Sequence, residues 1–242
     1  MWEPFSVCYL QMRLMVLPTL ILLTAVLALA SGPTVWIARF SENDSENLME
    51  EWETWEFSNV PRTTRYSLSE DEGITVLKAE SSGAASALMK SADIDAIRHP
   101  VLAWRWKTDG PIVEDDWNNE SDDYPLRLFV IFEGKSGLLG VIRRAVGGFN
   151  GRALNYVWVP ETASVPQTSA SPVTDRVQMI PIRQGSARFG TWASEKRNVV
   201  EDYLEAFGEE PGRIVGFAVM TDTDGTGGTC TSYFGDIGMA SQ

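Results

Sequence analysis

The stretch that most constrains the fold of this chain is His99–Phe132. It consists of two strand-like segments joined by an acidic loop. Val101–Lys107 alternates between large apolar residues and smaller or charged ones, which is typical of a β-strand with two different faces. Leu126–Phe132 is apolar on both faces except for Arg127, which predicts a central strand covered on both sides. Arg105 and Arg127 are therefore long cations within otherwise apolar strands, and each needs a partner or a ligand.

The remainder of the chain predicts more strands and one helix. Short alternating segments recur, for example at 154–159 and 176–182, separated by stretches rich in Gly, Ser and Pro. A helix is predicted at Glu195–Phe207, with Ser194 as its N-cap and Gly208 just past its end. The apolar stripe expected to face the core consists of Val200, Tyr203, Leu204 and Phe207. Many short strands with one packed helix predict an all-β protein, a β-sandwich forming one domain over residues 51–242.

Charge and histidine content exclude several classes of function. The 242 residues carry 33 acidic and 20 basic side chains, giving a formal net charge of −13. This unpatterned acidic surplus argues against binding to nucleic acid or to an anionic membrane surface, since both require clustered Lys and Arg. His99 is the only histidine, so a His-rich zinc site is excluded and a Ser-His-Asp triad would have to use this residue.

The N-terminal region has the pattern of an export signal. Arg13 precedes the apolar run Leu14–Ala30, which closes on small residues and predicts cleavage before Ser31. We expect residues 1–30 to be a signal peptide and 31–50 to be an acidic segment, with the mature protein periplasmic or extracellular. The alternative is a permanent membrane helix, which Pro18 and the short span disfavour; contact with a membrane is expected only through this segment. Cys230 is then the one remaining cysteine, and a buried thiol is the favoured interpretation.

The predicted ligand site combines cations with aromatic residues on strands. Arg105 and Arg127 would supply bidentate donors, and Tyr156 and Trp158 an aromatic platform, which suits a sugar or a carboxylated ligand. Asp122 and Asp123 border the strand that carries Arg127, and one of them is expected to pair with an arginine. The alternative is that the aromatic residues are core and the arginines are structural.

A metal site is the second candidate. Asp222, Asp224 and Asp236 offer the carboxylate oxygens that a structural calcium ion prefers, with the first two on a glycine-rich turn. The pattern is not that of an EF-hand, because the twelfth position of the loop is Tyr233. The alternative is a turn in which the Asp side chains accept hydrogen bonds from backbone N–H groups. The carboxylates of Glu114–Asp123 are interpreted mainly as a solvated loop.

An ordered set of short motifs resembles a known family. The chain resembles the uncharacterised family numbered 3047 among the domains of unknown function, and the segments that carry the resemblance are Trp104-Arg105-Trp106, Asp122-Asp123-Tyr124, Leu154-Asn155-Tyr156-Val157-Trp158, Asn198–Tyr203, Met220–Asp224 and Tyr233–Ile237. The resemblance implies an exported bacterial protein with a jelly-roll-like sandwich, similar in outline to carbohydrate-binding modules. It implies no activity. The family more often has Asp-Asn-Thr where this chain has Asp224-Gly225-Thr226.

Three functions remain open at this point. The first is a non-catalytic binding module for a carbohydrate or a similar polar small molecule. The second is a carbohydrate-active enzyme of lyase type, which could use Arg and Tyr and would need no histidine. The third is a structural envelope protein without a small ligand. Nucleophilic catalysis is disfavoured because the chain has no G-x-S-x-G elbow and no phosphate-binding loop.

Overall fold

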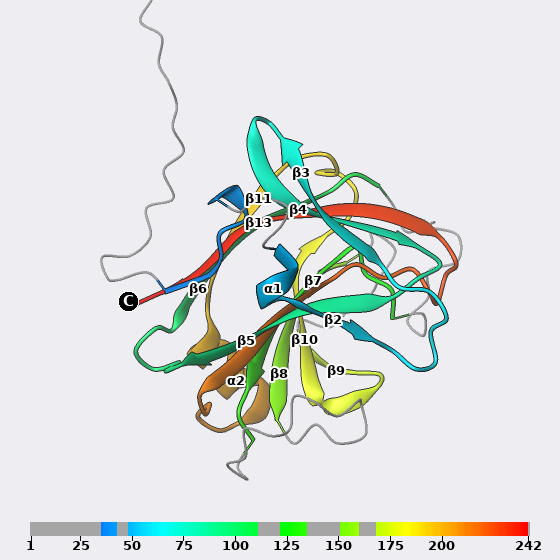
Figure 1. The fold of residues 1–242 in the computed structure, drawn as a ribbon. Coiled ribbons are helices and arrows are strands. Elements are labelled where there is room, and N and C mark those ends of the chain that lie inside the picture. Colours follow the sequence, from blue (N-terminus) through cyan, green and yellow to red (C-terminus); the bar gives the residue numbers. More distant parts are fainter. Residues whose placement is uncertain (1–34, 43–47, 111–121, 135–150, 160–167, 242) are drawn as a thin grey trace, which may run out of the picture.

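The computed structural model describes residues 35–42, 48–110, 122–134, 151–159 and 168–241 (Figure 1). These residues form two β-sheets that pack face to face, so the predicted jelly-roll-like β-sandwich is confirmed. Sheet A has the order β11-β6-β13-β4-β3, with β1 also paired to β13, and sheet B has the order β2-β5-β12-β7-β8-β10-β9. Neighbouring strands are antiparallel except β8 and β10, which are parallel.

The strands of sheet A are β1 (Val35–Ala38), β3 (Arg65–Asp71), β4 (Ile74–Ser82), β6 (Val101–Thr108), β11 (Ala193–Asn198) and β13 (Thr229–Ala240). Those of sheet B are β2 (Glu53–Glu56), β5 (Ser86–Ile94), β7 (Leu126–Phe132), β8 (Arg152–Val159), β9 (Ser169–Ser171), β10 (Thr174–Gln184) and β12 (Ile214–Met220). The helices are η1 (Phe40–Glu42), α1 (Leu48–Glu51) and α2 (Val199–Phe207). Among the described residues, no helix has the length and apolar character that a membrane crossing requires.

Both strands singled out from the sequence are internal to their sheets, and the central position predicted for Leu126–Phe132 is confirmed. β6 lies between β11 and β13, and β7 lies between β12 and β8. Alternate residues of a strand point to opposite faces. Trp104 and Trp106 therefore point together into the core, where they are 1% and 0% exposed. Arg105 and Lys107 lie on the opposite, outer face of sheet A.

Aromatic rings connect the two sheets across the core. The ring of Trp104 lies 5.2 Å from that of Tyr156, and Trp106 lies 6.4 Å from Trp158, measured between centroids. The Tyr156 hydroxyl donates to Asp202 at 2.7 Å, and the Trp158 indole N–H donates to the Gly185 carbonyl at 3.0 Å. Because both β8 aromatics are fully buried and have internal partners, the prediction that they form a ligand platform is corrected: they belong to the core.

Helix α2 begins four residues later than predicted, at Val199. The preceding residues form β11, which pairs in register with β6, so that Ala193 is opposite Trp106. The N-cap is therefore Asn198 rather than Ser194; its side-chain oxygen accepts from the backbone N–H groups of Val200 and Glu201. Gly208 ends the helix with φ of 70°, as expected for a C-cap glycine.

The buried face of α2 also differs from the prediction. Val199, Asp202 and Tyr203 are buried, whereas Leu204 is 50% exposed. Asp202 can be buried because its carboxylate accepts from Arg197 as well as from Tyr156. With Asp202 and Tyr203 on the buried face, Leu204 points towards solvent.

The folded region starts earlier than the expected boundary at residue 51. β1 pairs with β13, and Phe40 of η1 is fully buried against Trp52. Part of the segment 31–50 is thus integral to the sandwich. The predicted signal peptide, residues 1–30, lies outside the described residues. Cys230 is buried in β13 and is not disulfide-bonded.

Candidate functional site

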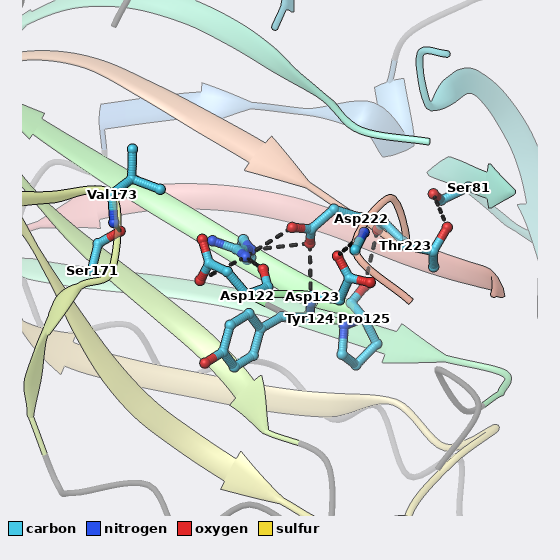
Figure 2. A network of polar contacts seen from close by, with 12 residues as sticks. Ser81, Asp122, Asp123, Tyr124, Pro125, Ser171, Val173, Asp222 and Thr223 are labelled. Carbon is cyan, nitrogen blue, oxygen red and sulfur yellow. Dashed lines mark hydrogen bonds and ion pairs between the residues drawn. The ribbon is translucent and has the colours of Figure 1, made fainter. Parts of the chain in front are cut away.

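Arg127 is buried on β7 opposite Met220, the last residue of β12. Figure 2 shows the network around it, with the labelled residues Asp122, Tyr124 and Asp222. Its Nε donates to Asp222 Oδ1 at 3.0 Å, and its Nη2 lies 2.8 Å from Asp222 Oδ2. Asp122 approaches the guanidinium from the other side, through its backbone carbonyl and through its carboxylate at 3.2 Å. The Tyr124 ring, 4.6 Å from Arg127 Cζ, covers one face of the guanidinium.

Arg127 has a structural role in this network, because it is only 4% exposed and its guanidinium is bound by residues of the protein itself. Burial lowers the pKa of Arg127, but the carboxylates of Asp222 and Asp122 more than offset this effect, so the guanidinium stays charged. Burial raises the pKa of Asp222, and the guanidinium opposes that rise. The predicted pairing of Arg127 with Asp122 is present, with Asp222 as a second partner that the sequence prediction had assigned to a metal.

Asp123 organises the turn that follows Asp222. Its carboxylate accepts from the backbone N–H groups of Gly225, at 3.1 Å, and Thr226, at 2.7 Å. The alternative given above assigned such hydrogen bonds to the side chains of Asp222 and Asp224, whereas here Asp123 accepts them. Asp123 therefore faces neither Arg105 nor an open ligand site; it is 1% exposed.

The carboxylate cluster differs in membership from the predicted calcium site. Oxygens of Asp123, Asp222 and Asp224 lie within 4.8 Å of one another. Asp236 is used elsewhere, because its two oxygens accept from the backbone N–H and the hydroxyl of Ser41. Burial and the neighbouring Asp123 raise the pKa of Asp224. Calcium binding at this cluster stays a prediction. A calcium ion would compete for Asp222 with the guanidinium of Arg127, which already supplies a positive charge there.

The outer face of sheet A brings together a second group of polar and aromatic side chains. We call it the sheet A platform; it consists of Trp192, Arg105, Lys107, Tyr233 and Asp71. Lys107 and Tyr233 are directly opposite each other on β6 and β13. Trp192 precedes β11 and reaches the platform because the chain turns at Gly190, whose N–H donates to the Thr108 carbonyl at the end of β6.

The side chains of the platform stack on one another. Arg105 Cζ lies 4.5 Å from the centroid of the Trp192 ring. Lys107 Nζ lies 4.4 Å from the Tyr233 centroid and 5.6 Å from that of Trp192. The two aromatic rings are 6.5 Å apart, and both are partly exposed. Each cation therefore lies at a cation–π distance from an aromatic ring.

Asp71 fixes this arrangement from the edge of the sheet. It accepts from Lys107 Nζ at 2.7 Å and from the Trp192 indole N–H at 2.6 Å. The hydrogen bond from Lys107 is the main cause of the lowered pKa of Asp71. Burial and the neighbouring Asp109 raise the pKa of Tyr233 to about 12, so its hydroxyl is a neutral donor and acceptor at physiological pH.

Of the predicted ligand residues, only Arg105 lies on the platform. Trp192, Tyr233, Lys107 and Asp71 were not predicted as site residues. The alternation of Val101–Lys107 does place Lys107 beside Arg105, on the face opposite the buried tryptophans. The pairing of Tyr233 with Lys107 and the fold of Trp192 over β6 depend on strand register and on a turn between distant segments, which no local pattern specifies.

A cavity of about 380 Å³ lies elsewhere, beside the only histidine, and is lined by Val35, Asp93, Ile94, Asp95, Arg98, His99 and Arg213. Its charged groups pair within the cavity wall: Arg213 with Asp93, and Arg98 with Asp95. The imidazole of His99 is the only aromatic ring among these lining residues. The sheet A platform is the better ligand site, because its two partly exposed aromatic rings adjoin Arg105, which has no carboxylate partner among the described residues.

Comparison with solved structures finds matches at low sequence identity. One is the family 11 carbohydrate-binding module of the cellulosomal cellulase Lic26A-Cel5E of Clostridium thermocellum, at 6% identity and a TM-score of 0.46, with 88% of this chain and 97% of that chain covered. A family 11 carbohydrate-binding module from Clostridium thermocellum, in complex with a β-1,3-1,4-mixed-linked tetrasaccharide, gives 7% identity and a TM-score of 0.45. The match covers 88% of this chain and 98% of that chain.

The K3 cleaved adhesin domain of Lys-gingipain from Porphyromonas gingivalis w83 gives 11% identity and a TM-score of 0.40, with 86% and 100% covered. At these values no ligand is transferred to this chain. Comparison with curated proteins finds no match. The model of the family described as "Protein of unknown function (DUF3047)" matches residues 50–238, and the chain belongs to this family, as its ordered motifs predicted.

Proposed function

We propose that this protein is a non-catalytic binding protein for a carbohydrate or a similar polar ligand, and that the ligand binds on the sheet A platform. The observation that carries the proposal is the partly exposed pair Trp192 and Tyr233, 6.5 Å apart, with Arg105 and Lys107 stacked against them. Aromatic rings present large apolar faces next to polar groups, and binding sites combine such faces with a few placed donors.

The rigidity of the platform supports a binding role. Arg105, Lys107 and Tyr233 are on paired strands of one sheet, and Asp71 holds both Trp192 and Lys107 by hydrogen bonds. Side chains held on strands and by surrounding hydrogen bonds lose little conformational freedom when a ligand binds. The platform is thus ordered before the ligand arrives.

The protonation states favour binding over lyase chemistry at this place. A lyase needs a base that removes a proton from the sugar ring near neutral pH. The pKa of Tyr233 is raised to about 12, mainly by burial, and Asp71 is engaged by Lys107 and Trp192. These groups serve a bound sugar as donors and acceptors rather than as proton-transfer groups.

We also propose that the protein is exported. The support is the sequence pattern alone: Arg13, the apolar run Leu14–Ala30 and the small residues before Ser31. N-terminal sequencing of the protein made by its native host should find Ser31 as the first residue. An intact leader on membrane-bound protein would contradict the proposal.

The ligand proposal is tested by a glycan array, followed by calorimetric titration of any glycan that binds. Trp192→Ala should weaken binding by roughly 30-fold, because buried aromatic anchors in binding sites are worth about 2 kcal/mol or more. Trp36→Ala is the matched control: Trp36 is also an exposed tryptophan of sheet A with an arginine, Arg39, 5.3 Å from its ring, but it is opposite Gly238 on β13 rather than at the platform.

The outcomes separate the three functions. Binding that Trp192→Ala weakens by roughly 30-fold and Trp36→Ala leaves intact supports the platform. Equal binding by the wild type and Trp192→Ala would move the ligand away from it. A glycan that becomes shorter during incubation would indicate the lyase, and an array on which nothing binds would favour a structural envelope protein.

A further inference from the structure

Arg105 differs from the other partly or fully buried arginines on the described strands. Arg127 pairs with Asp222, Arg183 with Glu195 and Arg197 with Asp202. Within the described part of the chain, Arg105 has neither a salt bridge nor a hydrogen bond to an acceptor, although it is partly buried in the middle of a sheet. Its guanidinium therefore keeps its N–H donors available for a ligand.

The charge of Arg105 is the uncompensated one on the platform. Lys107 lies 2.7 Å from Asp71 and 3.9 Å from Asp109, so carboxylates of the protein itself already balance its charge. Asp71 senses Arg105 only weakly, as the last of the causes that lower its pKa. The platform therefore offers one free positive charge on a protein whose formal net charge is −13.

Gly235 of β13 makes the space in which Arg105 lies. A Cβ atom at Gly235 would lie 2.5 Å from both Cγ and Nε of Arg105, far inside van der Waals contact. With glycine at this position, the arginine side chain can lie along the sheet with its guanidinium 4.5 Å from the Trp192 centroid. Backbone on one side and an indole ring on the other hold the guanidinium in one place.

We propose that Arg105 binds a carboxylate of the ligand, so that the ligand class is an acidic glycan that contains uronic acid residues. The inference rests on the proposed function and adds the class of sugar to it. A guanidinium donates two parallel hydrogen bonds to a carboxylate, a geometry that a point charge cannot reproduce. Trp192 and Tyr233 then contact the sugar ring while Arg105 binds its acidic group.

The test compares acidic oligosaccharides with their carboxyl-reduced forms, which keep the sugar ring and lose the charge. Oligogalacturonate, oligoalginate and a hyaluronan oligosaccharide serve as probes, with a sulfated carrageenan oligosaccharide as the other anionic source. Calorimetric titration should show that the wild type binds at least one carboxylated probe roughly 10- to 100-fold more tightly than its reduced form, the range expected for hydrogen bonds to a charged group. Preference for the sulfated probe over every carboxylated one would overturn the assignment to a carboxylate.

Three variants distinguish Arg105 from the rest of the platform. Arg105→Gln should remove the preference for the carboxylated probe, so that the acidic and the reduced forms bind with similar affinities. Arg105→Lys should also lose most of the preference, because lysine has no fork of donors. Gly235→Ala should act in the same direction by displacing Arg105, without any change of a polar group; its melting curve and its affinity for the reduced probe report whether the fold is intact.

The failures of the two proposals are distinguishable. If Trp192→Ala abolishes binding but Arg105→Gln leaves the ratio of acidic to reduced affinities unchanged, the platform binds glycans and the carboxylate assignment is wrong. If the reduced probes bind as tightly as the acidic ones in the wild type, the conclusion is the same. If neither form of any probe binds, the carboxylate assignment is refuted, and the glycan array with the Trp192→Ala variant decides the platform proposal separately.

Discussion

Removing either partner of the Arg127–Asp222 pair should destabilise the fold, but with different dependences on pH. Asp222 accepts from Arg127 at 2.8 and 3.0 Å and from the backbone N–H of Tyr124 at 3.1 Å. Asp222→Asn leaves a buried guanidinium whose nearest carboxylate is that of Asp122, at 3.2 Å. Breaking one side of a buried pair costs about 3–5 kcal/mol, and since a guanidinium does not deprotonate, we expect this cost at every accessible pH.

Arg127→Met leaves the opposite problem, a buried carboxyl without its cation. This carboxyl can become neutral by binding a proton, at a cost of about 1.4 kcal/mol for each pH unit above its unfolded pKa of about 3.9. The cost is about 1.5 kcal/mol at pH 5 and about 4 kcal/mol at pH 7. The sign follows from the raised folded pKa: the folded state binds the proton more tightly, so stability is lost as pH rises until the folded pKa is reached.

The double variant Arg127→Met/Asp222→Asn is the matched control, because it has the same methionine and no carboxyl to titrate. Urea unfolding of both variants at pH 5, 6, 7 and 8, followed by tryptophan fluorescence, measures the difference directly. It should grow by about 1.4 kcal/mol per pH unit. A difference that is independent of pH would mean that water reaches Asp222 once Arg127 is gone, and that the site is not dry.

Other predictions concern helix α2 and the carboxylate cluster. Leu204→Ala should change the free energy of unfolding by less than about 0.5 kcal/mol, because Leu204 is 50% exposed; Tyr203→Ala, at a buried aromatic, should cost about 3–5 kcal/mol. Asn198→Ala should cost about 1 kcal/mol through loss of the N-cap, and Asn198→Ser should restore most of it in the same unfolding assay. If calcium binds at the carboxylate cluster, millimolar CaCl₂ should raise the melting temperature and Asp224→Asn should remove the rise. An unchanged melting temperature would contradict the calcium site and would mean that Arg127 is the cation that balances these carboxylates.

Much of the fold could be predicted from alternation alone. The apolar run Leu126–Phe132 predicted the central position of β7, and the alternation of Val101–Lys107 predicted the two different faces of β6. The predicted start of α2 was wrong because residues 193–198 pair with β6. A pairing partner about 90 residues away in the sequence outweighs the local preference for helix. The burial of Asp202 instead of Leu204 likewise depends on Tyr156 and Arg197, which come from other elements.

The site was harder to predict, as the two arginines show. In the sequence they are equivalent, because each is a long cation in an otherwise apolar strand. In the structure, both lie on the outer faces of their sheets. The segment before β7 and the turn after β12 cover Arg127 with Asp122 and Asp222, so its charge is used within the fold. The turn before β11 covers Arg105 with Trp192, which attracts the cation but leaves its N–H donors unsatisfied. What decides between a structural and a binding arginine is therefore the side chain that the neighbouring loop supplies: a carboxylate completes the hydrogen bonds of the guanidinium, whereas an indole ring positions it for a carboxylate from outside.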